Sequence, residues 1–173
     1  MKNKKTIQII SSAMLLMQSS FMYAQQNMRS SWQVSPSLEH YSSAARTNGS
    51  SSRLDTAGIR VQHPIVNENV YVAGQVHTAY SGHAGGYTTG MVGVGIKSTP
   101  TAQGLSVGAE VLAGGGRGGD VDRSGVLVQP MVYGQAELNR DWGVKLGFGR
   151  MKSDKGNLNS NLVNLSLTYN LGR

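Results

Sequence analysis

Residues Asn161–Leu171 read NLVNLSLTYNL. The apolar residues of this segment occupy every second place from position 163 onward: Val163, Leu165, Leu167, Tyr169 and Leu171. Polar residues fill the places between them. A period of two is that of a β-strand with one apolar and one polar face. The sequence therefore predicts an amphipathic β-strand here.

The same alternation recurs along the chain, so that eight strands of roughly 10 residues are expected. They span 31–41, 54–63, 70–80, 87–97, 104–113, 126–138, 142–151 and 161–171. An even number of alternating strands separated by Gly, Ser and Asn turns is typical of bacterial outer-membrane barrels. The predicted fold is all-β, an eight-stranded antiparallel up-and-down transmembrane β-barrel.

The connections and the aromatic residues point the same way. Odd-numbered connections of roughly 12, 6, 12 and 9 residues alternate with connections of about 6, 6 and 3, as outer loops alternate with periplasmic turns. Two interface girdles are predicted, because aromatic side chains of the apolar faces gather near strand ends. They are Trp32, Trp142 and Tyr169 at the periplasmic ends, and Tyr80 and Phe148 at the outer ends.

The first residues have the pattern of a secretory signal. Lys2, Lys4 and Lys5 precede an apolar stretch, and Ala24 supplies a small residue at its end. This order of charge, apolar segment and small residue is that of a signal peptide. We expect residues 1–24 to be the signal peptide and residues 25–173 to form the barrel domain.

Composition excludes several classes of protein. The chain has no Cys, so it has neither disulfides nor Cys-ligated metals. Its net charge is +7, of which the signal segment carries three, and no basic run with interleaved aromatics indicates nucleic-acid binding. No segment has the roughly 20 apolar residues of a transmembrane helix.

Strand periodicity directs a set of polar residues into the barrel. An eight-stranded barrel is just wide enough for its inward side chains, and buried carboxylates are costly unless they are paired. We expect a hydrogen-bonded ion network that plugs the lumen; the alternatives are a proton or ion path, or a carboxylate pair that performs acid–base chemistry. The inward residues are Glu39, Arg60, Gln75, His77, Glu110, Tyr133, Gln135, Glu137 and Lys145.

The outer half of the predicted barrel is basic. Arg and Lys bind phosphate well, so this rim could pair with lipopolysaccharide phosphates; solvated loops are the alternative interpretation. The candidate contacts are Arg46, Arg53, Arg117, Arg123, Lys152 and Lys155, with Arg150 in the same region.

No catalytic, cofactor or metal site is predicted. The four histidines are scattered, and the glycine-rich stretch 114–120 lacks the Gly-Lys-Ser/Thr ending of a phosphate-binding loop. His77 could act as a base beside a serine nucleophile, which leaves a lipid A-modifying enzyme as an alternative.

In length, strand count and loop asymmetry the chain resembles the small eight-stranded outer-membrane barrels, the group of OmpX and the OmpA transmembrane domain. Its last strand resembles the signal by which the outer-membrane assembly machinery recognises such proteins. The resemblance implies a monomer in the outer membrane, in contact with lipid and lipopolysaccharide. We expect a non-enzymatic barrel that contributes to envelope structure or surface interaction. A small transport pore and a soluble periplasmic barrel are the remaining alternatives.

Overall fold

The computed structural model describes residues 32–82, 84–122 and 124–171. The predicted signal peptide, residues 1–24, lies outside these ranges. The described residues contain eight strands, as the sequence predicts. They are β1 (Trp32–Ala45), β2 (Ser51–Asn67), β3 (Val70–Gly82), β4 (Thr88–Lys97), β5 (Leu105–Arg117), β6 (Leu127–Glu137), β7 (Trp142–Ser153) and β8 (Asn159–Leu171).

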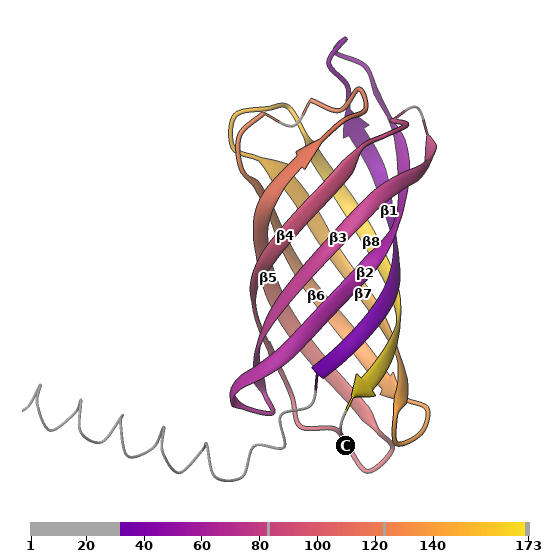
Figure 1. The fold of residues 1–173 in the computed structure, drawn as a ribbon, viewed down its shortest axis with the longest axis vertical. Coiled ribbons are helices and arrows are strands. Elements are labelled where there is room, and N and C mark those ends of the chain that lie inside the picture. Colours follow the sequence, from indigo (N-terminus) through magenta and orange to yellow (C-terminus); the bar gives the residue numbers. More distant parts are fainter. Residues whose placement is uncertain (1–31, 83, 123, 172–173) are drawn as a thin grey trace, which may run out of the picture.

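The strands form one closed antiparallel barrel, which confirms the predicted fold (Figure 1). Each strand pairs with the next in the chain, and β1 closes the barrel against β8 through pairs such as Leu38 with Leu165. We call the end where β1 begins and β8 finishes the terminal end. The opposite end, which carries the β1–β2, β3–β4, β5–β6 and β7–β8 connections, is the loop end. Closure leaves no strand edge unpaired.

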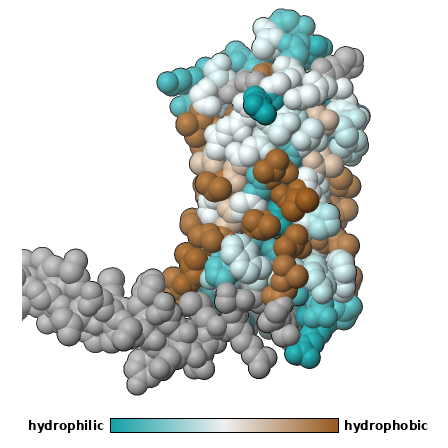
Figure 2. Space-filling model, viewed as in Figure 1, coloured by the Kyte–Doolittle hydropathy of each residue, from teal (hydrophilic) through white to brown (hydrophobic). Residues whose placement is uncertain are grey.

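On the face of the barrel that Figure 2 shows, hydrophobic residues gather in the middle and hydrophilic residues toward the two ends. Alternation sends every second side chain outward, where hydrophobic residues of all eight strands are exposed, among them Leu38, Ile59, Val76, Val92, Val107, Val132, Leu146 and Leu165. In water such a surface would be unfavourable, whereas hydrocarbon accommodates it. The barrel therefore has the surface of a membrane-spanning protein rather than of the soluble alternative.

No helix among the described residues has the length and hydrophobicity that a transmembrane helix needs.

The aromatic residues agree in part with the predicted girdles. At the terminal end Trp142 lies 4.7 Å from Tyr169 between ring centroids, and Trp32 is stacked on His63 at 4.5 Å. Tyr80 is exposed near the loop end of β3. Phe148, however, points outward at the middle of β7, where it pairs with Val132 and Val163. It is not at the strand end, because β7 continues five residues beyond it. Its placement in the outer girdle was wrong.

Two predicted loops are partly strand. Within the predicted loop 42–53, β1 continues to Ala45 and β2 begins at Ser51, since Ala44 pairs with Ser52 and Ala45 with Ser51. The predicted glycine-rich loop begins only at Gly118, because Gly114–Gly116 pair with β4. A Cβ on Gly114 would lie 2.0 Å from the carbonyl oxygen of Gly90, so only glycine allows this close approach of the strands. β2 also continues through Pro64, where a turn was expected.

Candidate functional site

The lumen contains a buried carboxylate that joins four strands. Glu39 of β1 accepts hydrogen bonds from the Tyr41 hydroxyl at 2.6 Å and from Gln129 Nε2 of β6 at 2.8 Å. Asn164 of β8 and Gln75 of β3 donate to the same carboxylate at 3.3 and 3.4 Å. A carboxylate out of water needs such donors, because an unpaired buried charge costs several kcal/mol. Glu39 is thus the centre of a network that crosses the lumen.

A second contact of Glu39 is with the His77 imidazole. The Nδ1 atom of His77 lies 3.0 Å from Glu39 Oε2, and its Nε2 atom lies 2.7 Å from the Ser37 hydroxyl. Ser37 pairs with Gly58, and Gly58 pairs with His77, so the three residues lie side by side on β1, β2 and β3. A Cβ on Gly58 would lie 2.1 Å from the His77 ring. The glycine therefore gives the imidazole the space to reach Ser37.

An ion pair lies beside this cluster. The guanidinium of Arg60 on β2 pairs with Glu110 on β5, and both side chains are buried. Arg60 also donates to Gln75 Oε1 at 3.0 Å, and Gln75 donates to Gln129 at 2.9 Å. The hydroxyl of Tyr71 donates to Glu110 at 2.7 Å. Gln75 therefore links the Arg60–Glu110 pair to the Glu39 network.

Lys145 lies in the lumen with neutral partners. Its ammonium donates to Gln62 Oε1 at 3.2 Å and lies 4.3 Å from the centroid of the Tyr133 ring. The face of an aromatic ring attracts a cation through its quadrupole. The expected pairing of Lys145 with carboxylates was therefore wrong. Glu110 pairs with Arg60 instead, and Glu137 is only half-buried at the end of β6.

The structure brings together most of the predicted inward residues. Glu39, Arg60, Gln75, His77, Glu110, Tyr133, Gln135 and Lys145 are buried in the lumen, whereas Glu137 is not fully enclosed. The alternation did not predict the roles of Ser37, Tyr41, Tyr71 and Asn164. Their inward parity was visible in the alternation, but which strands face each other across the lumen depends on the tilt and stagger of the closed barrel.

The loop end of the lumen is filled by apolar side chains instead. Strand residues such as Leu54, Met91 and Leu127 are buried there, and the connections add Ala84, Val121 and Leu158. Voids lined by such groups exclude water. We call this group the apolar plug. The loop residues of the plug carried no periodic signal, which is why the sequence did not predict it.

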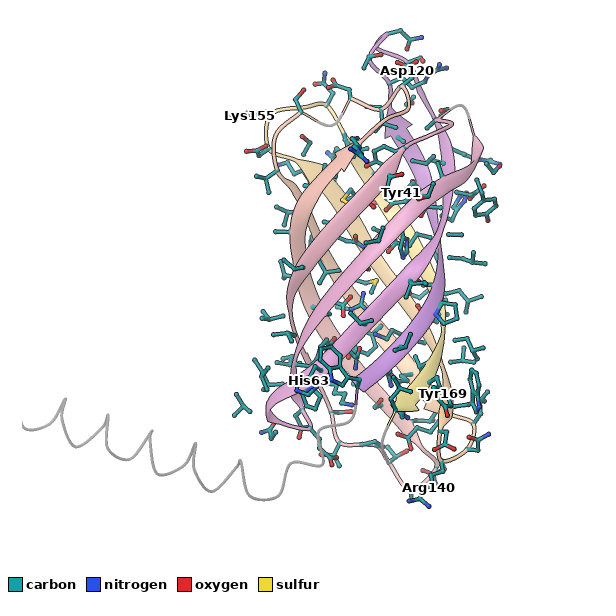
Figure 3. The ribbon with its side chains drawn as sticks, viewed as in Figure 1. Tyr41, His63, Asp120, Arg140, Lys155 and Tyr169 are labelled. Carbon is teal, nitrogen blue, oxygen red and sulfur yellow. The ribbon has the colours of Figure 1, made fainter. Side chains whose placement is uncertain are left out.

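The β5–β6 connection holds the plug in place by contacts with two other connections. Asp120 accepts hydrogen bonds from the Arg46 guanidinium at 2.7 Å and from the Thr47 hydroxyl of the β1–β2 connection. Asp122 accepts one from Asn157 Nδ2 of the β7–β8 connection at 2.6 Å. We call the β1–β2, β5–β6 and β7–β8 connections, which these hydrogen bonds join, the lid. Asp120 and Lys155 lie on its two sides at the loop end in Figure 3.

The predicted basic rim is distributed around the loop end. Arg46 is paired with Asp120, whereas Arg53, Arg117, Lys152 and Lys155 are exposed. Arg123 lies outside the described residues. Arg150 is exposed on β7, where its Nε atom donates to Asn159 Oδ1 at 2.6 Å.

No group of three or more metal-ligating side chains occurs within 32–82, 84–122 and 124–171.

Comparison with known proteins gives structural matches only. No family model and no curated protein sequence matches the chain. The N-terminal barrel of Pseudomonas aeruginosa OprF matches with a TM-score of 0.64 at 8% identity, over 82% of this chain and 97% of that one. Neisserial surface protein A matches with a TM-score of 0.58 at 13% identity, over 82% and 97% of the two chains. Ail of Yersinia pestis, in complex with the heparin analogue sucrose octasulfate, gives 0.57 at 13% identity, over 83% and 100%.

These matches show the fold. The chain has the architecture of the small eight-stranded outer-membrane barrels that its sequence resembles, and this fold and the apolar belt agree with the predicted outer-membrane location.

The two buried cations should respond differently to the same substitution. Arg60→Met leaves Glu110 buried without its cation, which typically costs about 3–5 kcal/mol. Lys145→Met removes a buried charge whose partners are neutral, so the free energy of unfolding should stay within about 1 kcal/mol of the original. Urea unfolding of the refolded proteins measures both changes. Equal losses of unfolding free energy in the two variants would mean that Lys145 also forms an ion pair with a carboxylate.

The lid should open in acid. The hydrogen bond from Thr47 and the Arg46 guanidinium lower the pKa of Asp120 below its usual value of 3.8. A lowered pKa in the folded state means that the contribution of Asp120 is present above about pH 4 and is lost as the pH falls through the lowered pKa. NMR signals of the Thr47 and Asp122 amides should report this loss. Asp120→Asn is the control, and a transition that persists unchanged in it would contradict the assignment.

Proposed function

We propose that this chain is a closed, non-enzymatic outer-membrane barrel whose polar plugged interior keeps it sealed, and which contributes to envelope structure or to surface interaction through its outer connections. The filled lumen is the observation that supports this proposal most directly. The Glu39 and Arg60–Glu110 networks occupy its middle, and the apolar plug occupies its loop end. An eight-stranded barrel offers no further width for a water-filled channel.

We further propose that residues 1–24 are removed as a signal peptide, which leaves 25–173 as a monomeric barrel with its loop end outside. The connections at that end carry the exposed cations Arg53, Arg117, Lys152 and Lys155. Such a rim fits lipopolysaccharide phosphates or another polyanion, because cationic side chains form charge-assisted hydrogen bonds with phosphate and sulfate groups. That Ail, a barrel of the same fold, was crystallised with sucrose octasulfate is in keeping with this idea.

Conductance separates a sealed barrel from the transport-pore alternative. The folded full chain, reconstituted in planar bilayers, should show no stable current steps, while a porin in the same bilayer provides the positive control. The physical reason is that both the polar network and the apolar plug would have to move before ions could pass. Stable channels from the purified chain would refute the proposal.

A second candidate function is a serine hydrolase that acts on lipid A or another ester. One observation favours it: Ser37, His77 and Glu39 have the distances of a nucleophile, a base and its orienting carboxylate. The burial of these groups argues against it, since Ser37 is 4% exposed and His77 is 0% exposed. Glu39 is also already occupied by donors from three other strands.

Labelling distinguishes the two candidates. A sealed, non-enzymatic barrel should not react with a fluorophosphonate probe, because the Ser37 hydroxyl is enclosed in the lumen. Lipid A from cells with and without the protein should have the same mass spectrum. Probe labelling that disappears in Ser37→Ala but persists in the neighbouring Ser35→Ala would establish the hydrolase instead.

A further inference from the structure

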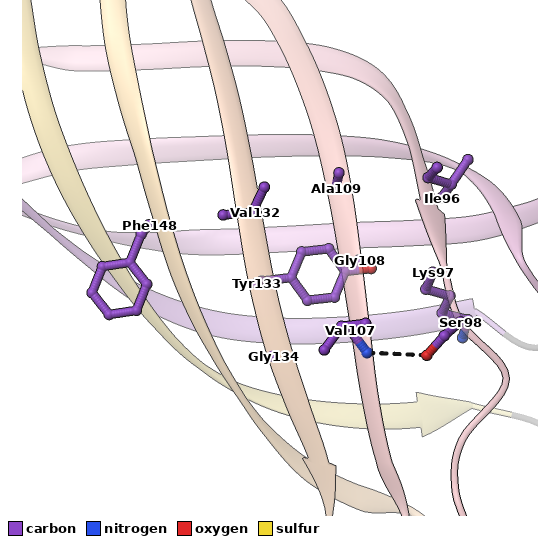
Figure 4. Close-up of a pocket in the computed structure, with 10 residues that line it drawn as sticks. All are labelled: Ile96, Lys97, Ser98, Val107, Gly108, Ala109, Val132, Tyr133, Gly134 and Phe148. Carbon is purple, nitrogen blue, oxygen red and sulfur yellow. Dashed lines mark hydrogen bonds between the residues drawn. The ribbon is translucent and has the colours of Figure 1, made fainter.

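Four neighbouring strands carry a straight row of outward side chains across the barrel wall. Register pairs join Ile96 of β4 to Ala109 of β5, Ala109 to Val132 of β6, and Val132 to Phe148 of β7. Figure 4 shows these four residues side by side on their strands. We call this row the ridge. It crosses the strands and therefore runs obliquely down the tilted wall of the barrel.

A groove lies on each side of the ridge. The groove toward the loop end has a volume of about 570 Å³ and is bounded by Val94, Val111 and Pro130, the outward residues of the next row. The groove toward the terminal end has a volume of about 720 Å³ and is bounded by Val107 and Gly134 (Figure 4). Both grooves lie within the apolar belt. In a membrane their occupants must be hydrocarbon chains, since no water is available there.

Small residues create the second groove. Gly134 is outward and exposed, and a Cβ placed on it would meet no atom within 4 Å. Ala109 contributes only a methyl group to the middle of the ridge. Larger residues in these places would fill the space between the neighbouring side chains. The grooves therefore follow from the residues chosen at two positions.

The groove toward the loop end reaches one cation, Arg150, and a second cation, Lys152, follows it along β7. Arg150 lines it and lies next to Pro130, in the register set by the Val128–Lys152 and Met131–Gly149 pairs. Lys152 is two residues further along β7, so it points to the same outward face. Both side chains are exposed, and Asn159 holds the Arg150 guanidinium through the 2.6 Å hydrogen bond. Arg150 is the ninth of twelve residues of β7 and thus lies in the loop half of the barrel.

We propose that this face of β4–β7 is a binding site for one phosphorylated glycolipid of the outer leaflet. A phosphate lies against Arg150 and Lys152, and acyl chains descend along the two grooves beside the ridge. The cation pair and the grooves together match such a lipid, because the cations can bind its phosphate and the two apolar grooves can accept more than one of its acyl chains. This inference rests on the proposed placement of the loop end outside, and it assigns the lipid contact to one site instead of the whole rim.

Lipid binding to the folded full chain tests the headgroup part of the proposal. Native mass spectrometry from detergent micelles would compare diphosphorylated lipid A, dephosphorylated lipid A and phosphatidylethanolamine. The double variant Arg150→Gln/Lys152→Gln should bind diphosphorylated lipid A about tenfold more weakly, since hydrogen bonds to charged groups contribute about 1.5–3 kcal/mol. Arg140→Gln, which removes an exposed cation of the β6–β7 connection at the terminal end, is the control and should bind as the original does. Arg53→Gln/Arg117→Gln removes two rim cations of β2 and β5 and should weaken binding much less than Arg150→Gln/Lys152→Gln does.

Substitution of glycine tests the groove part. Gly134→Leu fills the groove toward the terminal end and should lower the affinity for diphosphorylated lipid A several-fold. Gly90→Leu is the control, because Gly90 is also exposed with no atom within 4 Å of its Cβ, yet it lines neither groove. Both proteins should keep the original unfolding midpoint.

The outcomes separate this site from the general proposal. If Arg53→Gln/Arg117→Gln weakens lipid A binding as much as Arg150→Gln/Lys152→Gln does, the single site is overturned. A diffuse rim that binds anionic lipid would then remain. Equal binding of phosphatidylethanolamine, or no effect of Gly134→Leu, would also overturn it, because the face would then hold only ordinary membrane lipid. Current steps in planar bilayers would overturn the sealed-barrel proposal without affecting this test.

Discussion

A closed barrel of eight strands leaves so little space inside that each inward charge must find its partners among the other inward side chains. Glu39 meets this constraint with donors from β1, β3, β6 and β8, and Glu110 meets it with Arg60 and Tyr71. A slip of one residue in any strand would turn its inward face outward. The lumen network therefore ties the pairing of distant strands together, and the hydrogen-bond ladder alone does not decide the register.

The middle and the loop end of the lumen are filled by different kinds of side chain. The middle is polar and depends on directed hydrogen bonds, whereas the loop end is apolar and depends on close packing around Leu54 and Leu127. The connections contribute to the second part only. Asp120 and Asp122 hold the β5–β6 connection against its neighbours, so that Val121 can remain buried among strand residues. Sealing thus requires both a network formed by strands and a lid formed by connections.

Sequence alone predicted the strands, because alternation is a local signal that survives without knowledge of the partner. It also placed Glu39, Arg60 and Lys145 inside, because parity follows from the apolar face. It could not predict that Arg60 forms an ion pair with Glu110 while the Lys145 ammonium lies over the Tyr133 ring, since these contacts depend on the stagger of the closed barrel. The extent of strand at Gly114–Gly116 was missed because a glycine run signals a loop, while here it signals a close approach of backbones.

The lid has a consequence for length variation in this fold. The β5–β6 connection is held from both sides, so an added residue near Asp120 would displace Val121 and open the packed end. The tip of the β1–β2 hairpin at Asn48 and Gly49 is exposed and sends no side chain into the lumen, and a Cβ on Gly49 would meet nothing within 4 Å. Exposed tips of this kind tolerate inserted segments. With the proposed placement of the loop end outside, this hairpin tip offers a place to carry a foreign peptide beyond the residues that form the seal.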